Sequence, residues 1–156
     1  MKINGKTIQG PNEVITVIPR ENGDLIFKSR AILDYAKFDT LCKVPIAPFK
    51  KMPDGQTFPD FDDEGYKKAI RQFSERKVAF MIVDSLSATD GLEFETVKIN
   101  DPTTWENVET ELRTAGLTEV EIQRVIASVW EANGLDNQKI EEAKKRFLAS
   151  QLVVVK

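Results

Sequence analysis

The strongest constraint on the fold is a proline-rich segment that interrupts the chain after its first quarter. Four prolines fall within 15 positions: Pro45, Pro48, Pro53 and Pro59. Proline can neither continue a helix nor donate a hydrogen bond within a central strand. We therefore expect residues 44–63 to form a loop or extended strap. It separates an N-terminal region, residues 1–43, from a mainly helical region, residues 64–156, within one integrated domain.

The strap also carries large apolar side chains, which a purely solvated linker would not need. They are Val44, Ile46, Phe49, Met52, Phe58 and Phe61. Two interpretations are open. The strap either packs across the core of its own chain, which is the interpretation we favour, or forms an arm that binds a partner.

The first 30 residues predict short antiparallel strands. Asn4-Gly5 suits a two-residue hairpin turn, in which both residues need positive φ. Residues 13–18 are rich in Val and Ile, which strands prefer, and a turn at residues 21–24 returns the chain. Three short strands need a cover on one face, and we expect a helix over residues 29–41 to supply it.

The region after the strap is dominated by helix signals. A long helix is expected from Asp63 to Leu86, because acidic residues stand at its positive amino end and apolar residues recur along one stripe. Residues 92–99 alternate apolar and polar side chains and predict a half-buried strand.

Three further capped helices are expected in the last third of the chain. Capping boxes run from Thr103 to Glu106 and from Thr118 to Glu121, Asp136 can cap the last helix, and Gly116 and Gly134 are stop signals. Short turns between the helices favour a compact bundle. The Val-rich end, Leu152–Val155, predicts a strand that pairs with its own sheet or with that of another copy.

The predicted fold class is therefore α+β. It combines a small N-terminal antiparallel sheet with a packed helix, a Pro-rich strap, and a C-terminal bundle of capped helices. Apart from the last segment, each element is supported by local caps, turns and hydrophobic periodicity.

The composition excludes most of the common catalytic residue arrangements. The chain has no histidine and one cysteine, Cys42, so no Ser-His-Asp or Cys-His arrangement and no His-containing metal site can form. We expect no enzyme activity, no catalytic residues, no cofactor and no metal. A net charge of −3 argues against a nucleic-acid partner, and the apolar runs are too short to span a membrane. A single cysteine gives no sign of an oxidising compartment, so we expect the cytoplasm.

Two acidic motifs resemble functional sites. Residues 60–65 place carboxylates and a glycine as a calcium loop does, but Arg71 stands where the bidentate glutamate should be, so an acidic helix start is the better explanation. Glu93 and Glu95 share one face of the predicted strand and could serve a carboxylate-only hydrolase, but a solvated face explains them more simply. Cys42 is expected to be a buried, inert thiol.

The order of elements also resembles a known family. The segments that carry the resemblance are Ala79-Phe80-Met81-Ile82-Val83-Asp84-Ser85-Leu86, Leu92-Glu93-Phe94, Asp101-Pro102-Thr103-Thr104-Trp105, Glu111-Leu112-Arg113-Thr114-Ala115-Gly116-Leu117 and Ile140-Glu141-Glu142-Ala143-Lys144-Lys145-Arg146-Phe147-Leu148. Over residues 60–150 the chain resembles small tail assembly chaperones and related tail-region proteins of long-tailed bacteriophages. The resemblance is one of pattern and carries no diagnostic motif.

The resemblance implies a non-enzymatic protein of the host cytoplasm that binds the tape measure protein, keeps its hydrophobic helices soluble, and helps tail tube subunits assemble. An apolar groove would suit amphipathic helices. The residues expected to line it are Phe49, Met52, Phe58, Phe61, Phe80 and Met81. Alternatives are a structural tail or neck protein of the virion, which could form a homo-oligomer, and a small phage-encoded regulatory protein.

Overall fold

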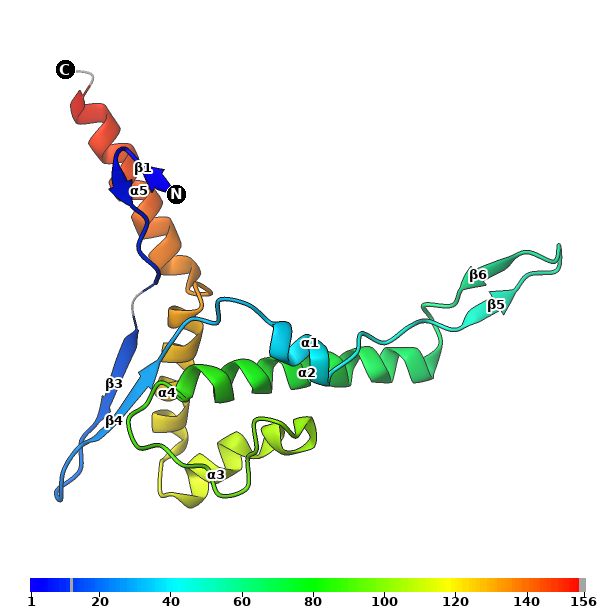
Figure 1. Cartoon of the computed structure of the whole chain (residues 1–156), viewed down its shortest axis with the longest axis horizontal. Coiled ribbons are helices and arrows are strands. Elements are labelled where there is room, and N and C mark those ends of the chain that lie inside the picture. The colour runs from blue at the N-terminus through cyan, green and yellow to red at the C-terminus, as the bar shows by residue number, and fades with distance from the viewer. Residues whose placement is uncertain (12, 155–156) are drawn as a thin grey trace. The chain divides into compact units, whose positions relative to one another are not determined.

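The computed structural model describes residues 1–11 and 13–154 (Figure 1). The chain divides into two compact units. Unit 1 comprises Met1–Ala31, Ser85–Gly91 and the chain from Glu119 on, and unit 2 comprises Ile32–Asp84 and Leu92–Thr118. Each unit is thus built from segments that are distant in sequence. This division differs from the sequence-based one, which followed the chain from end to end.

Unit 1 contains four strands and two helices within the described residues. They are β1 (Lys2–Ile3), β2 (Lys6–Thr7), β3 (Val14–Ile18), β4 (Leu25–Ser29), α4 (Glu119–Ala132) and α5 (Asn137–Val154). The hairpin of β1 and β2 turns at Asn4 and Gly5, whose φ values of 51° and 77° confirm the predicted turn.

The main sheet of unit 1 is the antiparallel pair β3–β4, and α4 covers one of its faces. Ile18, Phe27 and Ser29 point to this face and are buried. The Ser29 hydroxyl lies 2.9 Å from that of Ser128 on α4, so even the polar atoms of this face are paired. The helix predicted over residues 29–41 is only partly confirmed, because β4 runs through Ser29 and the helix forms later, over Ala36–Leu41 in unit 2. The cover of this sheet is α4 instead.

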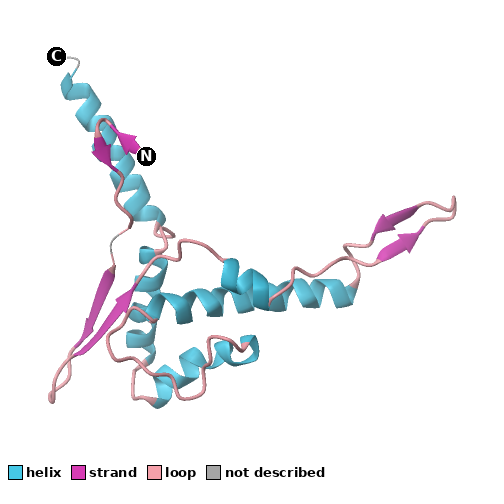
Figure 2. Cartoon of the chain, viewed as in Figure 1, coloured by secondary structure: helices cyan, strands magenta, loops and turns pink. Residues whose placement is uncertain are grey.

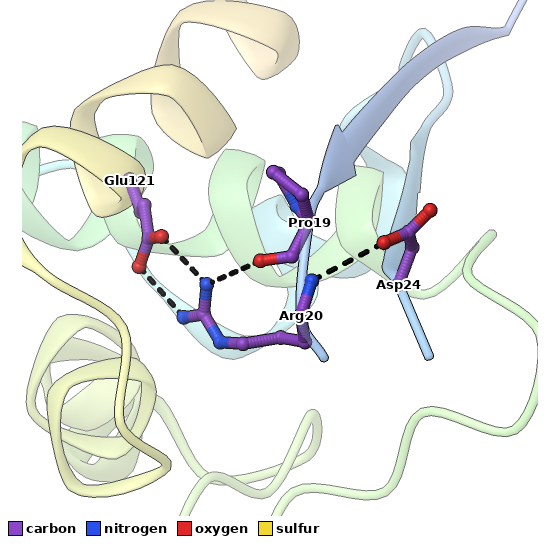
Figure 3. Close-up of polar contacts among 4 residues, drawn as sticks. All are labelled: Pro19, Arg20, Asp24 and Glu121. Atoms are coloured by element: carbon purple, nitrogen blue, oxygen red, sulfur yellow. Dashed lines mark hydrogen bonds and ion pairs between the residues drawn. The ribbon is translucent and has the colours of Figure 1, made fainter. Parts of the chain in front are cut away.

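A bidentate ion pair between Arg20 and Glu121 links the turn after β3 to the start of α4 (Figure 3). Arg20 donates from both terminal guanidinium nitrogens, Nη1 and Nη2, to the carboxylate of Glu121, at 2.7 and 2.8 Å. The same side chain donates to the carbonyl of Pro19, and its backbone N–H donates to Asp24. Bidentate Arg–carboxylate pairs fix orientation as well as distance.

The end of the long helix belongs to this unit because polar contacts tie residues 85–91 to β4 and α4. The backbone N–H of Lys28 donates to the hydroxyl of Thr89 at 2.8 Å, and that of Arg30 donates to the carbonyl of Ser85 at 3.1 Å. Asn133, after α4, donates to the hydroxyl of Ser85. These bonds anchor the chain where it leaves the helix.

Unit 2 is built around the long helix. Its elements are α1 (Ala36–Leu41), β5 (Phe49–Lys51), β6 (Thr57–Pro59), α2 (Glu64–Leu86, whose last two residues belong to unit 1), the 3₁₀ helix η1 (Pro102–Asn107) and α3 (Val108–Thr114). The predicted long helix is confirmed, and Asp63 caps it by accepting from the backbone N–H of Tyr66 at 2.8 Å. With small antiparallel sheets and five α-helices among the described residues, the α+β class is confirmed.

A cluster of aromatic rings forms the core of unit 2. Phe38 on α1 is fully buried, and its ring centroid lies 5.2 Å from that of Phe73, 5.6 Å from that of Phe80 and 6.1 Å from that of Trp105. The Trp105 indole donates to the carbonyl of Lys98 at 3.1 Å. A short helix of six residues is therefore held mainly by one side chain.

The strand predicted over residues 92–99 is wrong, and a carboxylate explains why. Glu111 on α3 accepts from the backbone N–H groups of Glu95, Thr96 and Val97 and from the Thr96 hydroxyl. The backbone N–H groups that would pair with a neighbouring strand thus donate to the carboxylate of one side chain instead. Burial alone would raise the pKa of Glu111, but these hydrogen bonds outweigh it and hold the pKa below its ordinary value.

Replacing Glu111 with glutamine is expected to lower the free energy of unfolding by about 1–2 kcal/mol at pH 7, because the charged acceptor is lost. A carboxylate with a lowered folded-state pKa stabilises the fold above its ordinary pKa and loses that effect as the pH falls. The difference between wild type and variant should therefore shrink between pH 6 and pH 3 in denaturant titrations. Glu93→Gln, at an exposed site, is the control, and a deficit that is equal at both pH values would contradict this role.

The caps of the last third are partly as predicted. Asp136 caps α5 by accepting from the backbone N–H of Lys139 at 3.2 Å, and Gly116 and Gly134 have φ values of 97° and 70°. The capping box at residues 103–106 is wrong. Asp101 is the cap instead, since its carboxylate accepts from both the backbone N–H and the hydroxyl of Thr103.

The helix α5 does not pack in the predicted bundle, because every residue from 137 to 152 is exposed. The predicted C-terminal strand is wrong up to Val154, since α5 runs to that residue; Val155 lies outside the described residues. The preceding residues are strong helix formers, and adding a residue to an existing helix costs far less than starting a new element.

Candidate functional site

The proline-rich segment forms an exposed hairpin arm, residues 48–60, that extends from the amino end of α2 (Figure 2). Every residue from 48 to 59 is exposed, so the interpretation we favoured, a strap packed across the core, is wrong. The prolines fit a two-stranded hairpin, since Pro53 lies in the turn and Pro59 in the end position of β6. A two-stranded sheet has only edge strands, where proline is tolerated.

Local hydrogen bonds give the arm its shape. The backbone N–H of Met52 donates to the carbonyl of Gln56 at 2.8 Å, and that of Gly55 donates to Met52 at 2.9 Å. The Asp54 carboxylate accepts from Gln56, and Gly55 has a φ of 85° that suits glycine. At the base, the N–H of Asp60 donates to the carbonyl of Pro48 at 2.6 Å. These hydrogen bonds are all formed within the arm, so its hairpin shape does not depend on packing against a core.

Large apolar side chains cover both faces of the arm. Phe49 is 70% exposed and stands opposite Pro59, whereas Phe58 is 50% exposed and stands opposite Lys50. Directly opposite residues share a face, so the two phenylalanines lie on opposite faces. Met52 in the turn is also exposed. Exposing large apolar side chains to water is unfavourable in free energy, and exposed apolar surfaces are typical of sites that a partner covers.

The base of the arm continues this apolar surface. Phe61 is exposed, and its ring centroid lies 5.9 Å from that of Tyr66 in the first turn of α2. Four of the six residues predicted to bind a partner therefore lie on the arm or at its base. The other two, Phe80 and Met81, are 2% and 5% exposed and belong to the core. They do not line a surface.

Sequence reasoning missed a second apolar surface on unit 1. The face of β3–β4 that points away from α4 carries Ile15, Val17 and Ile26, which are all more than half exposed. Val17 and Ile26 are direct cross-strand partners. The signal was available, because residues 14–18 are apolar at nearly every position. A strand with one solvated face would alternate with polar residues.

The calcium-like motif at residues 60–65 has a structural role. Asp60 accepts from the backbone N–H of Asp62, and Asp63 caps α2, so the calcium-like motif is an acidic helix start. No group of three or more metal-binding side chains occurs in residues 1–11 and 13–154. Within the same ranges, no helix combines the length and apolar character needed to cross a bilayer.

Cys42 is buried beside α2, as expected, and burial raises the pKa of its thiol although the nearby Arg76 opposes this shift. Because the thiolate is the reactive form, we expect an aromatic disulfide reagent at pH 8 to label native protein about tenfold more slowly than unfolded protein. Absorbance of the released thiolate would measure both rates. Rapid labelling of the native chain would show that the thiol is accessible.

Comparison with known proteins adds no assignment, since no protein-family model, no curated protein and no solved structure matches the chain.

Proposed function

We propose that this protein is a non-enzymatic assembly chaperone of phage tails, which binds the tape measure protein through the hairpin arm and assists tail tube assembly in the host cytoplasm. The observation that supports it most directly is the arm. Phe49, Met52 and Phe58 are exposed, as is every residue from 48 to 59.

The arm has the properties that binding of hydrophobic helices requires. Aromatic side chains are the commonest energetic anchors of protein interfaces, and methionine adapts to varied partners. Lys50 and Lys51 keep the hairpin hydrated beside its phenylalanines. Because the strand pairing is local, the arm can keep its backbone hydrogen bonds while its side chains meet a partner.

Co-expression with the long helical tail protein of the same genome would test the proposal. We expect the tail protein to be soluble and to co-purify only when this chain is present. Lysine-to-serine changes at Lys50 and Lys51, which spare the apolar side chains, are the matched control and should retain most of this effect. A tail protein that stays insoluble, or is equally soluble alone, would refute the chaperone function.

A structural tail or neck protein is the second candidate, and the open edges of β5 and β6 favour it, since exposed strand edges can pair between copies. The two candidate functions differ in whether the protein remains in the finished phage particle. A structural subunit would be found in purified particles at a fixed copy number, whereas a chaperone would be absent from them.

A further inference from the structure

The helix α5 presents an uncovered apolar stripe between cations. Ile140, Ala143 and Phe147 follow helical spacing and share one face, and Phe147 is 61% exposed. The positions that border this stripe are basic, with Arg146 and Lys139, which pairs with Glu131, on one side and Lys144, which pairs with Glu141, on the other. Four cations and two carboxylates, Glu141 and Glu142, give the helix a net positive charge.

Unit 2 contains a groove whose charge is opposite to that of α5. It has a volume of about 510 Å³ and lies between α2 and the segment of η1 and α3. Its apolar floor includes Ile82 and Val108, which are almost fully buried, and Val78, which is 41% exposed. The polar lining is mainly acidic, with Glu75, Glu106 and Glu109 against Arg113.

We propose that α5 of one copy docks in this groove of a second copy. The apolar stripe would cover Val78 and the floor, while the bordering cations would meet the carboxylates at the rim. Pairing of α5 with another α5 fits less well, because basic residues border the stripe on both sides and would face each other. This self-association is independent of the proposed chaperone function.

The proposed contact joins two different surfaces, so it is heterologous. An open assembly keeps one unused helix at one end and one unused groove at the other, so it can add further copies or close into a ring. The average mass in solution should rise with protein concentration and fall with added salt, because the rim contacts are exposed charges.

Charge reversal on each side tests the proposal by sedimentation velocity and light scattering. We expect Glu75→Lys with Glu106→Lys, and separately Lys144→Glu with Arg146→Glu, to reduce the wild-type assembly to single chains. Mixing the two variants, or combining all four changes in one chain, should restore assembly, because every groove then meets a helix of opposite charge. Circular dichroism would establish that each variant is folded.

The matched controls are Glu93→Lys and Lys145→Glu, which reverse exposed charges away from the groove and the stripe and should leave assembly unchanged. Wild-type protein that remains a single chain at all concentrations would overturn the proposal. So would assembly that survives both reversals, or reversed variants that fail to recover when mixed.

Discussion

Replacing Phe38 with alanine is expected to lower the free energy of unfolding by about 3–5 kcal/mol, which is the usual cost of deleting a buried aromatic side chain. Phe38 is fully buried and its ring meets those of Phe73, Phe80 and Trp105. A cavity at this position would affect α1, α2 and η1 together. Because typical domains are stable by only about 5–15 kcal/mol, unit 2 could lose its fold at moderate temperature.

Denaturant titration followed by tryptophan fluorescence would measure this loss. Trp105 lies in the ring cluster, whereas Trp130 lies on α4 in unit 1, so a Trp130→Phe background makes the signal specific for unit 2. Phe49→Ala is the matched control, since it removes the same atoms from an exposed site. Equal stability losses at the two positions would contradict the central role of Phe38.

Replacing both Phe49 and Phe58 with serine is expected to weaken binding of the proposed partner by several hundredfold, since anchor residues contribute about 2 kcal/mol each and about 1.4 kcal/mol is a factor of ten. Stability should change little, because both side chains are at least half exposed and the arm is held by backbone hydrogen bonds. Isothermal titration or pull-down against the co-purified partner would measure the affinity, and thermal unfolding the stability.

Because Phe49 and Phe58 lie on opposite faces of the arm, single variants can show which face the partner covers. Single changes report separately on the two faces of the arm, one with Phe49 and Pro59 and the other with Phe58 and Lys50. If only one single variant weakens binding, the partner covers one face. An unchanged affinity in the double variant would show that the arm is not the binding site, whatever the chain's function.

Signals that depend on neighbouring residues in the sequence predicted the local structure well. The turn at Asn4-Gly5, the long helix α2, the Asp136 cap and the glycine stops all follow from φ preferences, caps and periodicity. Four of the six candidate binding residues also proved to be exposed at the arm. Phe80 and Met81 were misassigned, because a helix stripe looks the same from the sequence whether it faces a core or a partner.

Signals that depend on distant residues were not available from the sequence. The segment at residues 92–99 alternates as a strand does, yet its donors end on Glu111, about 15 residues further along. The cover of β3–β4 comes from α4 and not from the next helix in the chain. The arm was mispredicted for a different reason, since its strand pairing is local and the prolines that suggested a loop are compatible with a two-stranded hairpin.

The interleaved segments of the two units have a consequence for a chain cut at the arm. Cleavage between Asp54 and Gly55 would leave a first fragment that holds β3, β4 and Phe38, while α4, Phe80 and Trp105 stay on the second. Each unit would then be completed only by both pieces. The protein is thus a natural candidate for split-fragment complementation, in which two separately made halves reconstitute one fold.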